Sequence, residues 1–285
     1  MACRRGYRCR VMEEGLQKKY EELKGLLREL GSVGVAFSAG VDSALLLYAA
    51  REALGEKMMA ITAVSPFFPV EEREAAEKIC RQWGISQVFL EVDTLHVSGV
   101  AENPRNRCYL CKKAILGRAM DEGRLHGMNC LAEGSNLDDE KDYRPGLRAV
   151  EELGVKSPLR EAGLCKREIR QLAREFGIPV WDKPSLACLA SRIPYGERIT
   201  EEKLERIGQA ETFLRFLGFS QVRVRCHEEG RLARIEVLPQ EVKLFLEDSL
   251  RERAEGSLRK MGFRFVALDL QGYRTGSLNE VAGKG

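Results

Sequence analysis

Residues 34–47 read G-V-A-F-S-A-G-V-D-S-A-L-L-L, and this stretch decides how the chain folds. The apolar, β-branched run Val33–Phe37 is typical of a buried strand, and Ala44–Leu47 is the start of a helix. A strand that turns directly into a helix leaves the first helical N–H groups unpaired, with the positive end of the helix dipole behind them. The turn at residues 38–43 therefore predicts an anion-binding site, an ordinary strand-to-helix turn being the plain alternative.

The side chains of this turn suit a phosphate group. Gly40 allows a close backbone approach or a positive φ, and the hydroxyls of Ser38 and Ser43 can donate hydrogen bonds to phosphate oxygens. Asp42 is compatible with a nearby phosphate if it caps the helix or holds a Mg²⁺ ion. The chain has no G-x-x-x-x-G-K-[ST] and no G-x-G-x-x-G here, so neither the common NTPase loop nor a dinucleotide fingerprint is present.

Strands and helices alternate along the first part of the chain. An amphipathic helix at 13–30 leads into the first strand. We expect further strands at 57–64, 87–92 and 129–132 and a helix at 70–83. This alternation predicts a parallel sheet with right-handed crossovers, in which ligands bind at the carboxyl ends of the strands. The 38–43 turn, the segment at Val64 and the loop that opens at Glu133 should therefore face one crevice.

The loop Glu133–Asp139 and the segment Tyr143–Gly146 are rich in turn residues and poor in apolar ones. Gly134 could let a nucleotide base or ribose approach the backbone, and Asp138 or Asp139 could bind Mg²⁺ or position a helix. A solvated turn is the alternative for this loop taken alone. At the edge of a parallel sheet the functional interpretation is favoured.

The composition is that of a soluble globular protein. At 285 residues, with 44% hydrophobic and 31% charged residues, the chain can bury a large core in one or two domains. No apolar run approaches the roughly 18 residues that a membrane span requires. A net charge of +3 is too small to indicate nucleic-acid binding. Residues 1–10 carry arginines but no apolar run, so they are not a signal peptide, and Met12 is an alternative start.

Nine cysteines in a chain without an export signal predict reduced thiols and a cytoplasmic location. Cys108 and Cys111 form a C-x-x-C pair at the start of a helix, and spacing alone leaves zinc, an iron–sulfur cluster and redox chemistry open. Cys188 lies in a proline-bracketed loop, where Lys183 and Arg192 should draw its thiol toward thiolate. Cys80 and Cys130 are expected to be buried as small hydrophobic residues. None of the remaining thiols has a spacing that suggests a pair: Cys3, Cys9, Cys80, Cys130, Cys165 and Cys226.

The character of the chain changes near Ile199, where a small α+β domain begins. Its expected elements are strands at 221–226, 231–238 and 263–268 and helices at 201–217 and 241–261, the second helix broken near Gly256. Alternation places Arg223 and Arg225 on one strand face, where two guanidinium groups suit a phosphate; a polar strand face is the alternative. We predict a parallel-sheet domain at 13–195, followed at 196–285 by a small domain for substrate binding or oligomerisation.

Residues 38–43 resemble the SGGxDS pyrophosphate loop of the ATP pyrophosphatases, whose members adenylate their substrate and release pyrophosphate. Ala39 stands where that family has its first glycine, so a backbone donor is expected to be less exposed there. The resemblance implies an α/β fold built on a pyrophosphate-loop domain. The residues that we expect to bind ATP are Ser38, Gly40, Val41, Asp42, Ser43, Val64 and Gly134.

Further motifs make the resemblance more specific. Together with the pyrophosphate loop, the segments 107–112, 133–139, 157–164 and 188–196 are similar to the LarE family, over nearly the whole chain from Glu13. LarE proteins are ATP-dependent sacrificial sulfur transferases that make the nickel-pincer nucleotide cofactor. The resemblance implies that ATP and Mg²⁺ activate a carboxylate of pyridinium-3,5-biscarboxylic acid mononucleotide by adenylation. A sulfur nucleophile then displaces AMP, and two rounds convert both carboxylates to thiocarboxylates.

The resemblance also gives roles to the cysteines. In this family the residue at the position of Cys188 gives up its own sulfur or, where a cysteine pair is present, shares a 4Fe-4S cluster. Because this chain has the pair, the resemblance implies a cluster on Cys108, Cys111 and Cys188 that delivers sulfur through its open iron. The positions that we assign to the mononucleotide substrate are Arg192, Glu211, Arg223 and Arg225.

Two other functions stay open from the sequence. A tRNA-thiolating or amidating ATP pyrophosphatase would share the loop and a cysteine pair, but a tRNA enzyme should carry a more basic surface. A nucleotide-binding regulatory module without catalysis is the other. We predict a cytoplasmic, homo-oligomeric enzyme that acts on a small mononucleotide and has no nucleic-acid or membrane partner.

Overall fold

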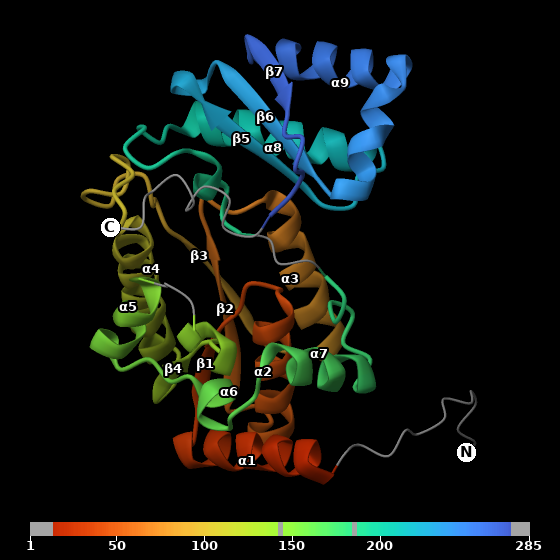
Figure 1. Ribbon diagram of the computed structural model, residues 1–285. Helices are drawn as coiled ribbons and strands as arrows, with labels where there is room; N and C mark the ends of the chain where they lie inside the picture. Colours follow the sequence, from red (N-terminus) through yellow and green to blue (C-terminus); the bar gives the residue numbers. More distant parts are fainter. Residues whose placement is uncertain (1–13, 142–144, 184–186, 275–285) are drawn as a thin grey trace.

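The computed structural model describes residues 14–141, 145–183 and 187–274. The sequence expectations about residues 1–13, Tyr143–Arg144 and residues 184–186 lie outside this part of the chain. The first part of the described chain alternates strands and helices and then continues in short helical segments (Figure 1). In order the elements are α1 (Glu14–Leu30), β1 (Val33–Ala36), α2 (Val41–Leu54), β2 (Met58–Val64), α3 (Val70–Trp83), β3 (Gln87–Glu91), α4 (Arg107–Leu125), β4 (Cys130–Ala132), η1 (Leu137–Lys141), α5 (Pro145–Leu153), α6 (Pro158–Glu161), α7 (Lys166–Glu175) and η2 (Leu189–Arg192).

Strands β1 to β4 form a parallel sheet in the order β3-β2-β1-β4. In its register Val33 of the central strand β1 lies between Met58 of β2 and Cys130 of β4. The start of β1 is buried, as a central strand of a parallel sheet with both faces covered must be. The predicted α/β parallel-sheet fold is confirmed, and the expected strands of this sheet lie within one residue of their observed ends.

Helices cover both faces of this sheet. One core contains residues of β1, α1, α2, α3, α6 and α7, and another lies among β2, β3, α4 and α5. α2 is buried almost throughout from Val41 to Ala50 because it is apolar all round. Its burial fixes the turn that precedes it at the carboxyl end of β1. Cys80 of α3 is buried as expected, whereas Cys130 of β4 is half-buried.

The second sheet contains β5 (Val222–His227), β6 (Leu232–Val237) and β7 (Phe265–Leu268). β5 is antiparallel and β7 is parallel to β6. Helices α8 (Glu201–Phe216) and α9 (Asp248–Lys260) contribute to the core beside this sheet. The small α+β unit predicted for the second part of the chain is therefore present, with a mixed sheet.

The expectation of one helix at 241–261, broken near Gly256, is wrong. The chain forms a 3₁₀ segment, η4 (Pro239–Leu246), and then α9, and it is interrupted at Glu247, where φ is −75° and ψ is 119°. Gly256 lies inside α9, and a Cβ there would meet no atom within 4 Å. A glycine inside a helix costs only about 1 kcal/mol, which the packing of α9 offsets. The interruption depends on the backbone of Glu247, and no glycine or proline marks it.

Loop residues beyond the carboxyl ends of the parallel strands pack into the core of the small unit. Phe67, which follows β2, and Val100, which follows β3, are buried in the core of the small unit. The Leu189 amide donates a hydrogen bond to the Phe67 carbonyl at 2.8 Å. Figure 1 shows the small unit lying over this end of the parallel sheet. A ligand at the carboxyl edge would therefore lie between the two units, and the domain boundary at 195/196 stays a prediction.

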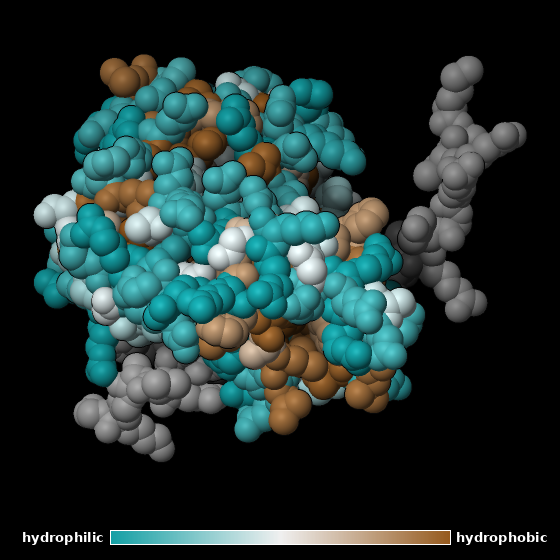
Figure 2. Space-filling model, turned by 90° about the horizontal axis from the view of Figure 1, so that it is seen from above, coloured by the Kyte–Doolittle hydropathy of each residue, from teal (hydrophilic) through white to brown (hydrophobic). Residues whose placement is uncertain are grey.

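The surface on the side of the small unit is mostly hydrophilic, with separate apolar areas (Figure 2). Large apolar side chains with high exposure include Leu125, Leu246 and Leu270. Within the described ranges, no helix combines the length and the apolar character needed to cross a lipid bilayer.

Candidate active site

The turn after β1 is closed by two serine hydroxyls. Ser43 Oγ accepts a hydrogen bond from the Ser38 amide at 3.3 Å and donates one to the Gly40 carbonyl at 3.1 Å. The two hydroxyl oxygens of Ser38 and Ser43 lie 3.2 Å apart. Gly40 is the N-cap of α2, and because glycine has no side chain, it forms no capping hydrogen bond with the first turn. A helix N-terminus that keeps its backbone donors in this way is what an anion site requires.

Ala39, and not Gly40, takes the left-handed backbone conformation of this turn. The φ angle is +53° at Ala39 and −83° at Gly40. Glycine would adopt the conformation of residue 39 without steric cost, which gives a physical reason for glycine at this place in related loops. Ala39 is fully buried, and its carbonyl accepts a hydrogen bond from Lys183 Nζ at 3.3 Å. An ammonium group therefore lies beside the turn.

Asp42 is held by residues from two other segments instead of capping α2. One carboxylate oxygen accepts a hydrogen bond from Lys166 Nζ, and Asn136 Nδ2 donates to the other oxygen at 3.4 Å. Because Lys166 is the first residue of α7, this ion pair joins the turn to that helix. Binding of Mg²⁺ by Asp42 stays a prediction, and it would require the carboxylate to be shared with Lys166.

The loop after β4 packs directly against the start of α2. A Cβ on Gly134 would lie 3.0 Å from the Ser43 amide nitrogen and 3.3 Å from the Asp42 Cβ. Because these contacts are with α2 backbone, which would have to shift by a few tenths of an ångström, a side chain at this position is disfavoured. The close approach that Gly134 permits in this structure is to α2, and its contact with a nucleotide stays a prediction.

Glu133 anchors the same loop from inside the protein. Its buried carboxylate accepts hydrogen bonds from Lys112 Nζ at 3.0 Å, Ser135 Oγ at 2.8 Å and Ser157 Oγ at 2.7 Å. Burial by itself raises the pKa of Glu133, but Lys112 and the two hydroxyls outweigh it and hold the pKa below the ordinary value. Glu133 is therefore ionised at neutral pH and fixes the loop to α4.

Asp138 and Asp139 both have structural partners. Asp138 Oδ2 accepts a hydrogen bond from the Lys166 amide at 2.8 Å, at the start of α7. Asp139 Oδ2 accepts one from the Asn136 amide at 3.0 Å. Of the two roles that the sequence left open, positioning a helix is the one observed for Asp138, and Mg²⁺ binding at either residue stays a prediction.

A cavity of about 250 Å³ opens at the carboxyl ends of β1 and β2, and we call it the β1–β2 cavity. Its lining is largely apolar, which suits a base and a ribose, and it adjoins the turn at Ser38. Val64 lines it, and the ATP-binding role of this residue stays a prediction. The residues that line the cavity come from β1, the turn, β2, the start of α3 and α4: Ala36–Ser38, Ile61–Ser65, Phe68–Val70, Glu72, Arg73, Ile115 and Ala119.

The three thiols that the sequence singled out lie in one region of the molecule. Cys108 and Cys111 lie on the first turns of α4, and Cys188 is the N-cap of η2. Each thiol lies close enough to the other two for their charges to interact. Arg107 Nη2 lies 3.7 Å from Cys108 Sγ, and the same guanidinium interacts with Cys188. Among the residues that the structure describes, no group of three or more His, Cys, Asp or Glu side chains is arranged to hold a single metal ion.

The expectation that Cys188 is drawn toward thiolate is wrong. Burial raises the pKa of Cys188 more than the nearby cations Arg107 and Arg192 lower it, and the charge of Cys108 adds to the rise. Burial also raises the pKa of Cys111 to about 12. Cys111 and Cys188 are therefore protonated at neutral pH in this structure. Sequence neighbours alone did not reveal how far the segment is buried.

Arg192 and Glu211 form a buried ion pair, with side chains only 1% and 2% exposed. Two parallel hydrogen bonds join them, from Arg192 Nε to Oε1 at 2.8 Å and from Nη2 to Oε2 at 2.9 Å. Glu211 also accepts from the Val224 amide at 3.0 Å, and Arg192 Nη1 donates to the Cys188 carbonyl at 3.0 Å. The pair therefore connects the Cys188 segment to α8 and β5.

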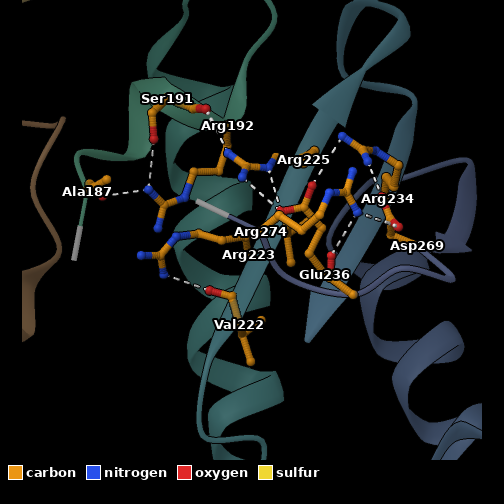
Figure 3. Close-up of polar contacts among 12 residues, drawn as sticks. Ala187, Ser191, Arg192, Val222, Arg223, Arg225, Arg234, Glu236, Asp269 and Arg274 are labelled. Atoms are coloured by element: carbon orange, nitrogen blue, oxygen red, sulfur yellow. Dashed lines mark hydrogen bonds and ion pairs between the residues drawn. The ribbon is translucent and has the colours of Figure 1, made fainter. Parts of the chain in front are cut away.

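Arg223 and Arg225 lie on one face of β5, as alternation predicts, and both are buried. Arg225 donates through Nε and Nη2 to one oxygen of Glu236, at 3.0 and 2.8 Å, and through Nη1 to the Ser191 carbonyl at 3.0 Å. Figure 3 shows this group extending to Arg234, whose Nη2 lies 3.2 Å from the other oxygen of Glu236. The charge of Arg225 is therefore partly compensated within the small sheet.

Arg223 has a different environment from Arg225. Its Nη1 donates to the Val222 carbonyl at 2.8 Å, and its guanidinium carbon lies 5.3 Å from the ring centre of Tyr273. Burial and the charge of Arg192 lower the pKa of Arg223 to about 10, although Glu211 opposes this change. Arg223 is still charged at neutral pH, and its interaction with a substrate phosphate stays a prediction.

Sequence reasoning gave no role to several charged residues that the structure places around this crevice. Lys112 binds Glu133, and Lys166 binds Asp42, but partner choice of this kind depends on tertiary contacts that spacing does not encode. Glu72 lines the β1–β2 cavity. It belongs to an acidic run at the start of α3, which is ordinary for any helix N-terminus, so the sequence carried no signal for it.

The parallel sheet, the serine-closed turn and the cavity beside it define an ATP pyrophosphatase of the pyrophosphate-loop type. No protein-family model matches the chain. It is 36% identical over 270 residues to the pyridinium-3,5-bisthiocarboxylic acid mononucleotide synthase of Lactiplantibacillus plantarum, covering 94% of this chain and 96% of that protein. The chain therefore belongs to the family of this synthase, the LarE family. The prediction of an ATP-dependent enzyme of the pyrophosphatase superfamily is confirmed.

Other relatives agree with this assignment. An uncharacterized protein of Synechocystis sp. is 43% identical over 270 residues, covering 94% of this chain and all of that protein. A chain of the glutamine-hydrolyzing GMP synthase of Pyrococcus furiosus is 24% identical over 224 residues, covering 72% of this chain and 69% of the GMP synthase chain. The similarity to the Lactiplantibacillus plantarum and Synechocystis proteins extends over both sheets, whereas the similarity to the GMP synthase covers less of the chain.

Proposed function

We propose that this protein uses ATP to adenylate the carboxylates of pyridinium-3,5-biscarboxylic acid mononucleotide and converts them to thiocarboxylates, in synthesis of the nickel-pincer nucleotide cofactor. The observation that carries the proposal is the relationship to the Lactiplantibacillus plantarum synthase over almost the whole chain. The three neighbouring thiols support sulfur transfer as the second half of the reaction. A cytoplasmic location and a homo-oligomeric state stay predictions.

In the adenylation step, ATP occupies the β1–β2 cavity with its base and ribose and directs its phosphates to the N-terminus of α2. The hydroxyls of Ser38 and Ser43 and the ammonium of Lys183 lie at this turn and can bind phosphate oxygens. A substrate carboxylate oxygen attacks the α-phosphorus, the bond to pyrophosphate breaks, and an acyl adenylate forms. The ammonium of Lys183 at the turn stabilises the charge that develops on the phosphates. A Mg²⁺ ion bound with ATP would supply further positive charge there.

The mononucleotide lies between the turn and the polar face of the small sheet. Arg223 is the residue to which we assign its phosphate, because a guanidinium binds two phosphate oxygens at once. Arg192 and Glu211 act as positioning residues, since each is the other's buried partner. Arg225 has a comparable supporting role through Glu236 and the Ser191 carbonyl.

We further propose that Cys108, Cys111 and Cys188 hold a 4Fe-4S cluster. The donor set fits: three thiols from two segments interact with one another, and a guanidinium beside them can balance the negative charge of a thiolate-bound cluster. A single ion needs all its ligands around one point, whereas a cluster takes each thiolate on a different iron. When bound, the cluster supplies one iron without a protein thiolate, which can carry a sulfur ligand.

The position of α4 connects the thiols with the nucleotide. Cys111 lies one helical turn before Ile115, which lines the β1–β2 cavity. Residues one turn apart share a helix face, so the thiol group and the cavity lie on the same side of α4. This favours attack by a sulfur nucleophile at the acyl carbon, with AMP as the leaving group, without a large movement of the chain.

The test is pyrophosphate release by anaerobically purified protein, with pyridinium-3,5-biscarboxylic acid mononucleotide, with tRNA and with no acceptor. We expect release only with the mononucleotide, and iron and sulfide contents that match one cluster. Replacing Cys108, Cys111 and Cys188 together by Ser should remove the iron and the thiocarboxylate product but leave pyrophosphate release. Cys130→Ser, at a half-buried thiol of β4, is the matched control. Repeated sulfur transfer by the triple variant would rule out the cluster.

A further inference from the structure

Glu72 is an acidic group inside the β1–β2 cavity, and neither step of the proposed reaction uses it. It lies on the first turn of α3, and it lines the cavity together with Ser38 of the turn and Val64 of β2. The other walls near it are largely apolar, including Phe68 and Ile115. A carboxylate in such surroundings is costly unless it is paired or protonated.

Charged groups from several elements face Glu72. Three cations act on it: Lys183 from the segment before η2, Arg192 from η2 and Arg223 from β5. Glu71 on its own helix opposes them. Burial dominates and raises the pKa of Glu72 to about 7, although the cations lower it. The remaining charged residue of the cavity wall is Arg73, whose guanidinium lies over the ring of Phe89, 4.9 Å from its centre.

An adenine nucleotide in this cavity would make the surroundings of Glu72 less favourable for an ionised carboxylate. The base and ribose would exclude water, which disfavours the charged form of a carboxyl. The phosphates would bring negative charge close to it and would neutralise cations such as Lys183, which lies at the turn. Each change favours the protonated carboxyl.

We propose that Glu72 is a binding residue of the nucleotide cavity in its protonated form, so that binding of an adenine nucleotide takes up a proton at this carboxyl. The proposal rests on the proposed function, because it requires ATP to occupy the β1–β2 cavity. A neutral carboxyl both donates and accepts hydrogen bonds, and it does not repel the phosphates. An ionised carboxylate can only accept hydrogen bonds, and it repels the phosphates.

The direction of the pH dependence follows from proton uptake. Affinity is complete below the pKa of Glu72 in the free protein and falls as the pH rises above it, because a proton must then be bound together with the nucleotide. With the free pKa near 7, we expect the dissociation constant to rise about tenfold from pH 6 to pH 8. At pH 7 the free carboxyl is half protonated, so binding takes up about half a proton.

Calorimetric titration with the α,β-methylene analogue of ATP and saturating Mg²⁺ tests this, at several pH values and in two buffers of different ionisation enthalpy. Glu72→Gln keeps the shape and hydrogen-bonding capacity of the neutral carboxyl. It should bind as tightly as the wild type does at pH 6, with less than twofold change up to pH 8, and it should lack the extra proton uptake. Glu74→Gln, at an exposed residue of α3, should behave as the wild type.

The outcomes separate this inference from the proposed function. If the analogue does not bind, the nucleotide cavity itself is wrong. If it binds with a dissociation constant that is flat from pH 6 to pH 8 in the wild type, Glu72 takes up no proton and the inference is overturned, whatever the variant does. A slope that persists unchanged in Glu72→Gln also overturns it, because another group would then bind the proton.

Discussion

Replacing Glu211 by Gln should destabilise this protein far more than an ordinary substitution on a helix. Gln keeps the shape of the side chain and removes the charge that balances Arg192. The guanidinium would stay in a site where its side chain is 1% exposed, with one of its two parallel hydrogen bonds to residue 211 facing an amide nitrogen. Water cannot replace the missing carboxylate without opening the contact between η2 and α8.

The expected cost follows from this burial. Breaking a buried ion pair by removing one partner costs about 3–5 kcal/mol, because it leaves an uncompensated charge in the interior. Arg192 also donates to the Cys188 carbonyl, so the guanidinium cannot turn toward solvent without losing a further hydrogen bond. We therefore expect Glu211→Gln to lower the free energy of unfolding by about 3–5 kcal/mol.

Urea unfolding followed by circular dichroism measures this difference, with a matched control on the neighbouring helix. Glu255 pairs with Arg259 on α9 at 3.1 Å, but these side chains are 47% and 57% exposed. Glu255→Gln should therefore cost less than about 1 kcal/mol. The double variant Arg192→Met with Glu211→Met should be more stable than Glu211→Gln, because it buries no unpaired charge.

Two results would refute this reasoning. One is a loss of less than about 1 kcal/mol for Glu211→Gln, which would mean that the pair is solvated and behaves as a surface pair. The other is additivity of the single substitutions Arg192→Met and Glu211→Met in the double variant. Residues in direct contact should instead show a coupling energy well above about 0.5 kcal/mol.

Three further predictions concern the turn, its supporting loop and the substrate face. Ala39→Gly should change the free energy of unfolding by less than about 1 kcal/mol, since relief of the left-handed backbone offsets the lost methyl burial, whereas Ala39→Val should cost at least about 2 kcal/mol in thermal or urea unfolding. Ser157→Ala removes a hydrogen bond that holds the pKa of Glu133 below its ordinary value of 4.5. That stability is present above pH 4.5 and is lost as the pH falls through the folded-state pKa, so acid unfolding of the variant should begin at a higher pH. Arg223→Gln should raise the KM for the mononucleotide at least tenfold more than the KM for ATP, in a pyrophosphate-release assay; equal changes would contradict the assignment of the phosphate to Arg223.

Much of the fold was predictable because its signals are local. The β-branched run of β1, the alternation of strands and helices and the helix at 70–83 follow from periodicity, and they lie where the sequence indicates. The position of the helix break predicted within residues 241–261 is wrong because it was based on residue type. Glycine at 256 is the strongest breaker in that segment, yet the extended residue is Glu247, which its residue type does not mark as a break.

The polar contacts of the site were less predictable than its elements. Alternation gives the common face of Arg223 and Arg225, but it does not show that Glu236 on the paired strand already binds Arg225. A sequence likewise cannot show that burial would keep Cys188 protonated beside two cations. Partner choice and burial are properties of the folded chain, and both decide whether a charged residue is available to a ligand.

The same contacts show why the two units predicted on either side of residues 195/196 depend on each other for stability. The core of the small unit includes Phe67 and Val100, which lie in the segments that follow β2 and β3, and each is at most 1% exposed. Burial of a large apolar side chain contributes about 1.5–3 kcal/mol, so the first unit alone would lose that stabilisation and expose an apolar surface at its ligand-binding edge. Arg192 adds a second link, because it joins the Cys188 carbonyl to Glu211 on α8. The segment that carries the third thiol is therefore held in place from the small unit. The proposed adenylation at the turn and the proposed sulfur transfer at the thiols would both depend on this interface.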